Sequence, residues 1–414
     1  MRASLHLCHP CSDNSRSGKG RAVERVEVLI IGAGAIGCAI AAELAERGQG
    51  GVVVVDRGRA GSGSSSRAAG GLRAQFSTEL NVRLTLLSQP YFREVAEQID
   101  WREDGYIFLA RSAEQAEAFQ RNVDLQRSLG VEAEWLTPDE LESRWPWLNA
   151  EGVVAATWCP TDAVFDQVKF MGVLAERARA AGAEIREGIE VTSLRVEDGR
   201  VTGVETANGP IEAGITVLAA GVWSPQVAAS IGLELPVSGL RREIFTFTGA
   251  PSLPDGIPFV ADFDIGNYIR QDENGLRISG TLTSGDDPDT PVNPADGERA
   301  LNWAATLVPA VAGVEQTGGW AGLTEMTPDH HALLGPVDGY EGLIVATGFS
   351  GHGVMHAPAT GMLVAELILD GAASSMDIAP LSPTRFAEGR GLVETMFARR
   401  HEQGDITTSG NDES

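Results

Sequence analysis

The segment from Val26 to Asp56 limits the possible folds of this chain more than any other stretch. It opens with a continuous apolar run of strand length, Val26 to Ile31, followed by a glycine-rich turn. An Ala/Ile/Leu-rich stretch then continues to Gly48, a residue that can cap a helix, and a second apolar run covers Val52 to Val55. The segment therefore predicts a strand, a tight turn, a helix and a second strand.

The glycines of the turn have the spacing G-x-G-x-x-G, and each has a separate physical task. Gly32 permits the turn, Gly34 lets the backbone approach a pyrophosphate, and Gly37 lets the helix pack closely on the strand. Asp56 follows about 20 residues later, where a dinucleotide site needs a carboxylate for the ribose hydroxyls. The pattern predicts dinucleotide binding, with the pyrophosphate at the helix N-terminus, where free N–H groups and the helix dipole favour an anion. A strand-to-helix turn without a ligand is the alternative.

Length and charge narrow the class of protein further. A chain of 414 residues is expected to form two domains. The net charge of −25 argues against nucleic acid and against an anionic membrane surface as partners, because both need a basic face. Residues 1–24 lack the apolar core of a signal peptide and are expected to form a disordered leader. No membrane insertion is expected, since no window holds about 18 uninterrupted apolar residues.

The cysteines indicate a reducing environment. Cys8, Cys11, Cys38 and Cys159 are too few and too scattered for a disulfide framework, which favours a cytoplasmic location. Cys8 and Cys11 resemble half of a metal site, but no second ligand pair accompanies them. We therefore expect no metal site and assign both residues to the leader.

The rest of the chain alternates between helical and strand patterns. Helical spacing covers 79–98, 113–129, 165–181 and 356–369, and strands are expected at 106–109, 183–186, 215–219 and 343–346. The pairs Asp198-Gly199 and Asn208-Gly209 lie between alternating strands and predict an antiparallel meander. Residues 236–324 are expected to hold short strands and Pro-rich loops, and the end after His401 to be disordered. The Gly/Ser-rich segment from Gly61 to Gly71 has the composition of a linker, but its position after the second strand favours contact with a flat ring.

Four separated segments are similar to one known family. They are GAGAIG with Asp56, SSSRAAGGLR, AAGVWS at 219–224, and TPDHHALLG followed by ATGFSGHGVMHAP. These motifs resemble the FAD-dependent amine oxidoreductases of the D-amino-acid oxidase, glycine oxidase and sarcosine oxidase superfamily. The resemblance covers roughly residues 25–375 in the same order, and it looks closest to the β subunits of sarcosine oxidase and proline dehydrogenase.

The resemblance implies an α/β fold class. A discontinuous Rossmann-type FAD-binding domain would alternate with an α+β substrate domain built on an antiparallel sheet. The expected boundaries are 25–100, 161–235 and 325–375 for the FAD-binding domain, 101–160 and 236–324 for the substrate domain, and 376–414 for a C-terminal extension with a disordered end. A hydride would pass from the C–N carbon of a small secondary or primary amino acid, such as sarcosine, proline or glycine, to the flavin, giving an imine that hydrolyses.

The resemblance also implies a set of cofactor-binding residues. The glycine-rich turn and the end of the second strand supply Gly32, Gly34, Ala35, Ile36, Gly37, Asp56 and Arg57. The Gly/Ser segment supplies Ser64, Ser65, Ser66, Ala69, Gly70, Gly71 and Leu72. The later segments supply Val191, Ala220, Gly221, Trp223, Gly348, Gly351, His352, Gly353, Val354 and Met355. The family members that attach flavin covalently use a cysteine near the Thr-Pro-Asp motif, and no cysteine follows Cys159 here, so the FAD is expected to be noncovalent.

The substrate carboxylate needs a cation, and arginine is preferred for bidentate pairing. By resemblance, Arg73 and Arg270 are the two candidates, with Tyr268 as a further contact and His352 as a hydrogen-bonding group beside the flavin. The alternative for either arginine is a solvated position on the surface. The alternative for His352 is a structural role in a loop.

Two other functions remain open at this stage. The chain could be the electron-transferring subunit of a hetero-oligomeric dehydrogenase, or a flavin-binding assembly factor similar to a respiratory-complex assembly protein of this superfamily. A homo-oligomer is also possible. The only lysines are Lys19 and Lys169, so no lysine in the second half of the chain can activate oxygen above the flavin, which favours a dehydrogenase over an oxidase.

Overall fold

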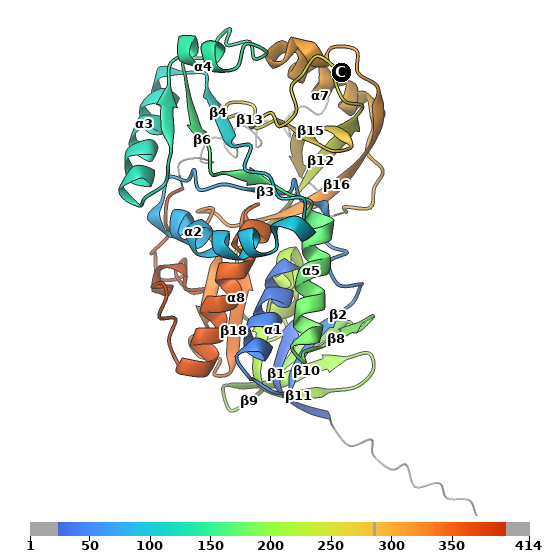
Figure 1. The fold of residues 1–414 in the computed structure, drawn as a ribbon. Helices are drawn as coiled ribbons and strands as arrows, with labels where there is room; N and C mark the ends of the chain where they lie inside the picture. The colour runs from blue at the N-terminus through green and yellow to red at the C-terminus, as the bar shows by residue number, and fades with distance from the viewer. Residues whose placement is uncertain (1–23, 285–286, 395–414) are drawn as a thin grey trace, which may run out of the picture.

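The computed structural model describes residues 24–284 and 287–394 (Figure 1). The strands of these residues form two eight-stranded sheets and a two-stranded ribbon. The predicted leader, Cys8, Cys11 and the predicted disordered end after His401 lie outside the described residues, apart from Glu24, which opens the first strand.

The first sheet contains the strand, turn, helix and second strand predicted from Val26 to Asp56. Its order is β17 (Leu333–Pro336), β18 (Leu343–Thr347), β11 (Ile211–Leu218), β1 (Glu24–Ile31), β2 (Val52–Asp56) and β8 (Glu184–Glu187), with β9 (Val191–Glu197) and β10 (Arg200–Thr206) attached through β11. The strands from β18 to β8 are parallel to one another. One face carries α1 (Ala35–Glu46), α5 (Gln167–Ala180) and α8 (Gly353–Asp370).

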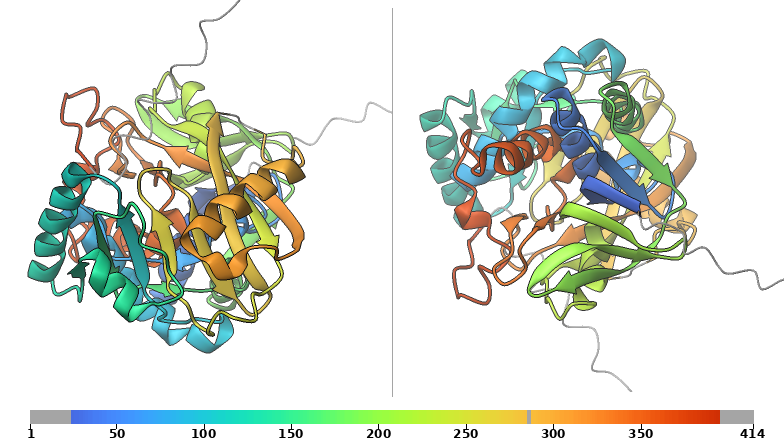
Figure 2. Two further views of the ribbon diagram at one scale, coloured as in Figure 1. Left: turned by 90° about the horizontal axis from the view of Figure 1, so that it is seen from above. Right: turned by 90° about the horizontal axis from the view of Figure 1, so that it is seen from below.

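Both faces of this sheet are covered, which explains why β1 is apolar without alternation. Val28 and Ile30 belong to the hydrophobic cluster formed with α1, α5 and α8. Leu29 and Ile31 point the other way and pack with residues of β9 and β10. Seen from below, the meander strands lie on the opposite side of β1 from the helices (Figure 2). Parallel strands buried on both faces read as continuous apolar runs.

Strand β11 joins the meander to the parallel sheet. The hairpin predictions at Asp198-Gly199 and Asn208-Gly209 are confirmed, because β9 pairs with β10 and β10 with β11 in antiparallel ladders. The strand expected at 215–219 is the second half of a longer strand, Ile211–Leu218, which also pairs in parallel with β1 and β18.

The second sheet is mainly antiparallel. Its order is β16 (Gln316–Met326), β12 (Ser238–Phe247), β15 (Gly275–Ser284), β14 (Tyr268–Asp272), β13 (Phe259–Asp262), β4 (Tyr106–Ala110), β6 (Ala155–Cys159) and β5 (Glu134–Leu136). Only the β13–β4 pair is parallel among these described strands. The ribbon joins β3 (Gly71–Leu72) to β7 (Ala163–Val164).

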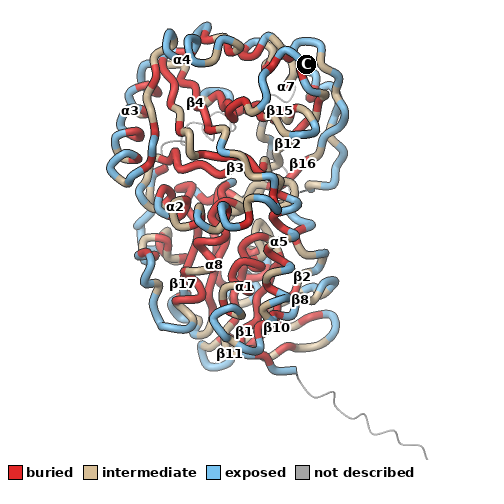
Figure 3. The backbone as a smooth tube through the Cα atoms, in the orientation of Figure 1, coloured by how far each residue is buried: buried red, intermediate tan, exposed pale blue. Residues whose placement is uncertain are grey.

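The remaining helices are α2 (Glu79–Glu94), α3 (Ala113–Ser128), α4 (Pro138–Arg144), α6 (Ser224–Ala229) and α7 (Pro294–Leu307). Helices α2 and α3 agree closely with the sequence prediction. Figure 3 shows β1, α1 and α8 as buried and the outer side of α3 as exposed.

Residues 236–324 differ from the prediction of short strands and loops. Strands β12, β15 and β16 are 10, 10 and 11 residues long, and α7 is a 14-residue helix. The start of α7 carries two local signals, because the Asn293 side chain accepts a hydrogen bond from the backbone N–H of Ala295 and Pro294 occupies the first turn. Because the region is rich in proline, the sequence did not predict α7, whose proline lies in the first turn, where it is tolerated.

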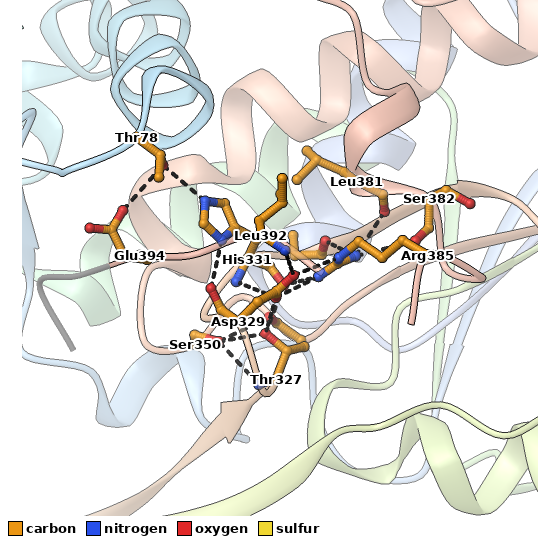
Figure 4. A network of polar contacts seen from close by, with 12 residues as sticks. Thr78, Thr327, Asp329, His331, Ser350, Leu381, Ser382, Arg385, Leu392 and Glu394 are labelled. Atoms are coloured by element: carbon orange, nitrogen blue, oxygen red, sulfur yellow. Dashed lines mark hydrogen bonds and ion pairs between the residues drawn. The ribbon is translucent and has the colours of Figure 1, made fainter. Parts of the chain in front are cut away.

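The C-terminal segment up to residue 394 is attached by a buried ion pair. Both carboxylate oxygens of Asp329 accept hydrogen bonds from the Arg385 guanidinium at 2.8 Å, and Arg385 has no exposed surface. Glu394 accepts hydrogen bonds from the Asn81 side chain (3.0 Å) and the Ser77 backbone N–H (2.9 Å). Figure 4 shows how this network joins the loop after β16 to the C-terminal segment.

Replacing Arg385 by glutamine should destabilise the protein by about 3–5 kcal/mol at neutral pH, because the carboxylate of Asp329 would stay buried without its cation. Burial alone would raise the pKa of Asp329, but the hydrogen bonds and charge of Arg385 outweigh it and hold the pKa below its usual value. This stabilisation is present above the unfolded-state pKa and is lost as pH falls through the folded-state pKa. The difference between wild type and variant in the free energy of unfolding should therefore shrink in acid.

The measurement is chemical denaturation at a series of pH values. Arg390→Gln is the control, because Arg390 and Glu388 form an exposed ion pair that is worth at most about 1 kcal/mol. Equal losses in the two variants would contradict the assignment of a stabilising buried pair.

Candidate functional site

A cavity of about 1070 Å³ lies at the carboxyl ends of the central parallel strands. Ile31 at the end of β1, Val55 near the end of β2 and Ala219 just after β11 all line it. Parallel strands place these ends along one edge of a sheet, which is where ligands bind in such folds. Arg242 and Tyr268 of the second sheet line the same cavity, so it lies between the two sheets.

The glycine-rich turn has the geometry that its spacing predicts. Gly32 has a positive φ of 107°, and a Cβ there would lie 2.4 Å from the carbonyl oxygen of Ala219. A Cβ on Gly37 would lie 1.9 Å from the carbonyl oxygen of Gly32, so a side chain would push α1 away from the turn. Gly34 instead borders the cavity, where a Cβ would approach only the Ser65 hydroxyl, at 3.2 Å.

Two side chains fix the turn and the N-terminus of α1. One carboxylate oxygen of Asp56 accepts a hydrogen bond from the backbone N–H of Ala33 at 2.8 Å, and the other accepts from Gly58 at 2.7 Å. The Ser65 hydroxyl accepts from the backbone N–H of Ala35, the first residue of α1, at 3.0 Å. The Gly/Ser segment is therefore an ordered part of the cavity wall and not a linker.

A smaller chamber of about 140 Å³ shares part of its wall with the large cavity. Its lining is mostly apolar and aromatic, and it includes Tyr106, Phe108, Phe259, Phe263, Tyr268, Val354 and Met355. Arg73 and Arg242 also line it, and among the described residues around it none carries a carboxylate. The aromatic rings pack tightly, since the centroids of Tyr106 and Phe259 are 4.1 Å apart.

Arg73 and Tyr268 place polar groups in this apolar chamber. The Arg73 guanidinium carbon lies 3.9 Å from the centroid of Phe76, and Nη1 donates to the carbonyl of Gln75. Burial lowers the pKa of Arg73, although the charge of Glu394 acts in the opposite direction. The Tyr268 hydroxyl has no hydrogen-bond partner among the described residues, and burial raises its pKa, so it stays a neutral donor. A buried polar group in this state matches a ligand atom that the protein itself does not supply.

The N-terminus of α8 forms another part of the cavity wall. His352, the residue before the first turn of α8, is buried, and burial together with the charge of Arg73 holds its pKa well below the ordinary value. Its imidazole is therefore neutral at physiological pH. Glu325 orders the loop before α8 by accepting hydrogen bonds from the Gly348 and Phe349 backbone N–H groups, at 2.9 and 3.2 Å. Burial raises the pKa of Glu325.

The structure brings most of the predicted residues to these two spaces. Those that line the large cavity are Gly32, Gly34, Ala35, Ile36, Asp56, Arg57, Ser64, Ser65, Ala69, Arg73, Val191, Ala220, Gly221, Trp223, Tyr268, Gly351, His352, Gly353 and Val354. Gly70, Gly71 and Met355 line only the chamber. Five predicted residues line neither space, namely Gly37, Ser66, Leu72, Arg270 and Gly348.

Arg270 is the clearest departure from the sequence analysis. Its Nη1 donates to the carbonyl oxygens of Ala69 (2.5 Å), Gly70 (2.6 Å) and Phe165 (3.2 Å), and 2% of its surface is exposed. These three carbonyls engage Nη1, and Nη2 lies 3.6 Å from a carboxylate oxygen of Asp272, so the group expected to bind a carboxylate faces protein atoms. Arg270 instead holds the chain segment at Ala69 and Gly70 that forms the cavity wall.

Among the wall residues that the sequence analysis did not name are Arg242 and Glu325. Arg242 follows Arg241 on β12, and neighbouring strand residues point to opposite faces, so one of the pair had to face inward. Nothing in the sequence decides which, because both faces of the second sheet are packed. Glu325 gave no signal, since its hydrogen bonds are to a loop more than 20 residues later.

Two kinds of site can be tested directly. Within residues 24–284 and 287–394, no three His, Cys, Asp or Glu side chains are grouped so as to hold a metal ion. In the same part of the chain, none of the helices has the length and apolar character needed to cross a bilayer.

Comparison with known proteins identifies the class. Residues 27–367 match the family described as FAD dependent oxidoreductase, so the chain belongs to this family. Glycine oxidase from Geobacillus kaustophilus is 33% identical over 87% of this chain and 97% of its own. The bovine FAD-dependent oxidoreductase domain-containing protein 1 is 30% identical over 90% and 87%. The crystal structure of L-proline dehydrogenase from P. horikoshii superimposes with a TM-score of 0.81 at 31% identity, covering 89% of this chain and 99% of that one.

The cavity fits the cofactor of this family, FAD. The N-terminus of α1 and the side-chain-free position at Gly34 face the cavity, which suits a pyrophosphate. Asp56 and Val191 line the same cavity. The segment Ala68–Ala69 and the N-terminus of α8 lie where the cavity meets the chamber.

Replacing Gly34 by valine should prevent FAD binding while leaving the fold intact. The backbone of Gly34 is extended, with φ −76° and ψ −172°, so valine is compatible with it, but the branched side chain would fill the space beside the Ser65 hydroxyl. Gly172→Val is the matched control, because Gly172 is an exposed position of α5 where a Cβ meets no atom within 4 Å. Flavin absorbance per mole of purified protein is the measurement. A Gly34→Val protein with one flavin per chain would place the pyrophosphate elsewhere.

Proposed function

We propose that this chain is an FAD-dependent oxidoreductase that oxidises a small secondary or primary amino acid at the C–N carbon. The observation that carries the proposal is the chamber that the Arg73 and Tyr268 side chains both line. This chamber shares Ala68, Ala69 and residues at the α8 N-terminus with the wall of the large cavity. The names of the relatives, a glycine oxidase and a proline dehydrogenase, support an amino acid as the substrate.

Arg73 is the proposed carboxylate ligand. A guanidinium offers a planar pair of N–H donors that matches a carboxylate, and hydrogen bonds to ionised groups are the stronger ones. Tyr268 adds a neutral donor whose hydroxyl has no other partner among the described residues. The aromatic and aliphatic lining excludes water and leaves room for a small molecule only. The residues thus orient a substrate by its carboxylate and hold its amine carbon toward the large cavity.

The chemistry is a two-electron oxidation. The substrate loses a hydride from carbon and a proton from nitrogen, the C–N single bond becomes an imine, and water then splits the imine into a carbonyl compound and an amine. FAD, when bound, supplies the hydride acceptor. Neutral His352 can accept or donate a hydrogen bond at the cavity wall without adding a charge. The N-terminus of α8 supplies the positive end of a helix dipole there.

We propose further that the FAD is noncovalent and that oxygen is a poor electron acceptor. Cys38 lies buried in α1 and Cys159 in β6, and neither of these described cysteines lines the cavity. Of the residues that line either space, none is a lysine, and Lys169 is paired with Asp100 on the surface. Acid precipitation that left the flavin attached to the chain would contradict the noncovalent assignment.

We also propose that the two sheets form the cores of the two domains. In this assignment the first sheet and α1, α5 and α8 belong to the FAD-binding domain, and the second sheet with α7 belongs to the substrate domain. Limited proteolysis with and without substrate analogues tests whether the parts behave as separate units.

Anaerobic mixing of the purified flavoprotein with a panel of amino acids tests the proposal. At least one small amino acid should bleach the flavin absorbance near its visible maximum, and the product should be a carbonyl compound. Arg73→Ala should weaken the binding of that substrate by about 2–5 kcal/mol, because the carboxylate loses its partner in a dry site. Arg73→Lys should restore only part of the loss, since an ammonium does not reproduce the planar pair of donors.

Esterification of the substrate carboxylate provides the control. The ester should bind much more weakly than the acid to the wild type, but not to Arg73→Ala, because both changes remove one interaction. Equal penalties in the two proteins would show that Arg73 does not contact the carboxylate. A panel in which no amino acid reduces the flavin would favour a non-catalytic or electron-transferring role instead.

A further inference from the structure

The small chamber is lined by two guanidinium groups, although one carboxylate needs only one. Arg73 comes from the segment after β3, and Arg242 comes from β12 in the second sheet. Both side chains also border the large cavity, so each can reach a ligand that lies at the junction of the two spaces. The described residues that line the chamber include no carboxylate, although Glu394 and Asp162, which lie outside the lining, act on Arg73 through their charges.

Arg242 has an unusual environment for a strand arginine. Its Nη1 donates to the carbonyl of Gly266 at 3.1 Å, and the guanidinium carbon lies 5.9 Å from the centroid of Tyr268. Its remaining N–H donors have no acceptor, and its charge no carboxylate partner, among the described residues. Burial lowers the pKa of Arg242, which is the direction expected when a cation lacks a counter-charge.

Neighbouring arginines of the same sheet are paired. Arg241, one residue earlier on β12, forms an ion pair with Glu243 and donates to the carbonyl of Thr290. Arg277 on β15 forms an ion pair with Asp272 at 2.6 Å. Arg241 and Arg277 are thus each paired with a carboxylate of the same sheet. Arg242, which faces the chamber, is not.

Arg242 is partly buried and borders both spaces. A cation that is partly removed from water without a counter-charge is costly, and the cost falls when a ligand brings the anion. Resting on the proposed function, we infer that the substrate is a small dicarboxylic amino acid, with one carboxylate on Arg73 and the second on Arg242. The second carboxylate is carried either on the substituent of the nitrogen or on the side chain. The chamber volume of about 140 Å³ limits both kinds of substrate to short molecules.

Binding of ethers tests this without any turnover. Methoxyacetate has one carboxylate and (carboxymethoxy)acetate has two, and neither has an amine that can be oxidised. Titration of the flavoprotein with each, followed by the change in flavin absorbance, should show the dicarboxylate binding about tenfold or more tightly, the worth of one hydrogen bond to a charged group. Arg242→Gln should remove this preference. Arg241→Gln, the matched control one residue away, should keep it.

Reduction of the flavin distinguishes the two possible positions of the second carboxylate, on the nitrogen substituent or on the side chain. Iminodiacetate carries the second carboxylate on its nitrogen substituent, and N-methylaspartate carries it on its side chain. At least one should reduce the flavin with a higher apparent second-order rate constant than N-methylglycine does, and Arg242→Gln should lower that ratio.

Equal affinity of the wild type for the two ethers, or no spectral change with either, would overturn the inference. So would loss of flavin from Arg242→Gln, which would assign Arg242 to the cofactor. A dicarboxylate preference that depends on Arg242, without flavin reduction by any amine, would uphold the two-carboxylate site and overturn the proposed function.

Discussion

The close approach of α1 to the first strand is the constraint on which the rest of the site depends. The helix reaches the turn so closely that a Cβ on Gly37 would lie 1.9 Å from the carbonyl oxygen of Gly32. This close packing puts the N-terminus of α1 at the edge where the parallel strands end. Asp56 and Ser65 then hold the backbone N–H groups of Ala33 and Ala35 in place. The chain's own residues thus order a helix N-terminus that suits an anion.

The buried charges of this protein are satisfied in different ways, and the differences separate structure from function. Arg385 is paired with Asp329, which attaches the C-terminal segment. Arg270 donates to carbonyl oxygens, which fixes the wall at Ala69 and Gly70. Glu325 accepts from backbone N–H groups, which orders the approach to α8. Each of these charges completes a part of the fold.

Arg242, which is only partly buried, differs from these residues. Its position on β12 gives it one carbonyl partner at 3.1 Å and no carboxylate among the described residues, while its neighbour Arg241 is paired with Glu243. Together with the Tyr268 hydroxyl, it leaves polar groups directed at an apolar chamber. A protein interior rarely keeps such groups unless something else binds them. These groups support the proposal that the substrate binds at the junction of the two sheets.

The sequence alone determined the local features of the first sheet and its turn. The apolar run Val26–Ile31, the glycine spacing and the acid at position 56 act within one short segment, so their geometry follows from steric and hydrogen-bonding rules. The meander also followed, because Asp-Gly and Asn-Gly turns are local signals. The sequence did not reveal that Ile211–Leu218 is one strand, or that α7 lies in a proline-containing region, since strand partners and packing decide both.

Only the tertiary structure decided which charged side chains line the chamber. Arg73, Arg242 and Arg270 are equally cationic in the sequence, but the backbone carbonyls around Arg270 come from segments about 100 and 200 residues away, and no local pattern encodes them. The alternation of β12 likewise requires Arg241 and Arg242 to face opposite sides without saying which side is the chamber. The role of each arginine depends on the hydrogen-bond partners that distant segments supply. Inside the protein these partners, and not the charge itself, decide what the side chain can bind.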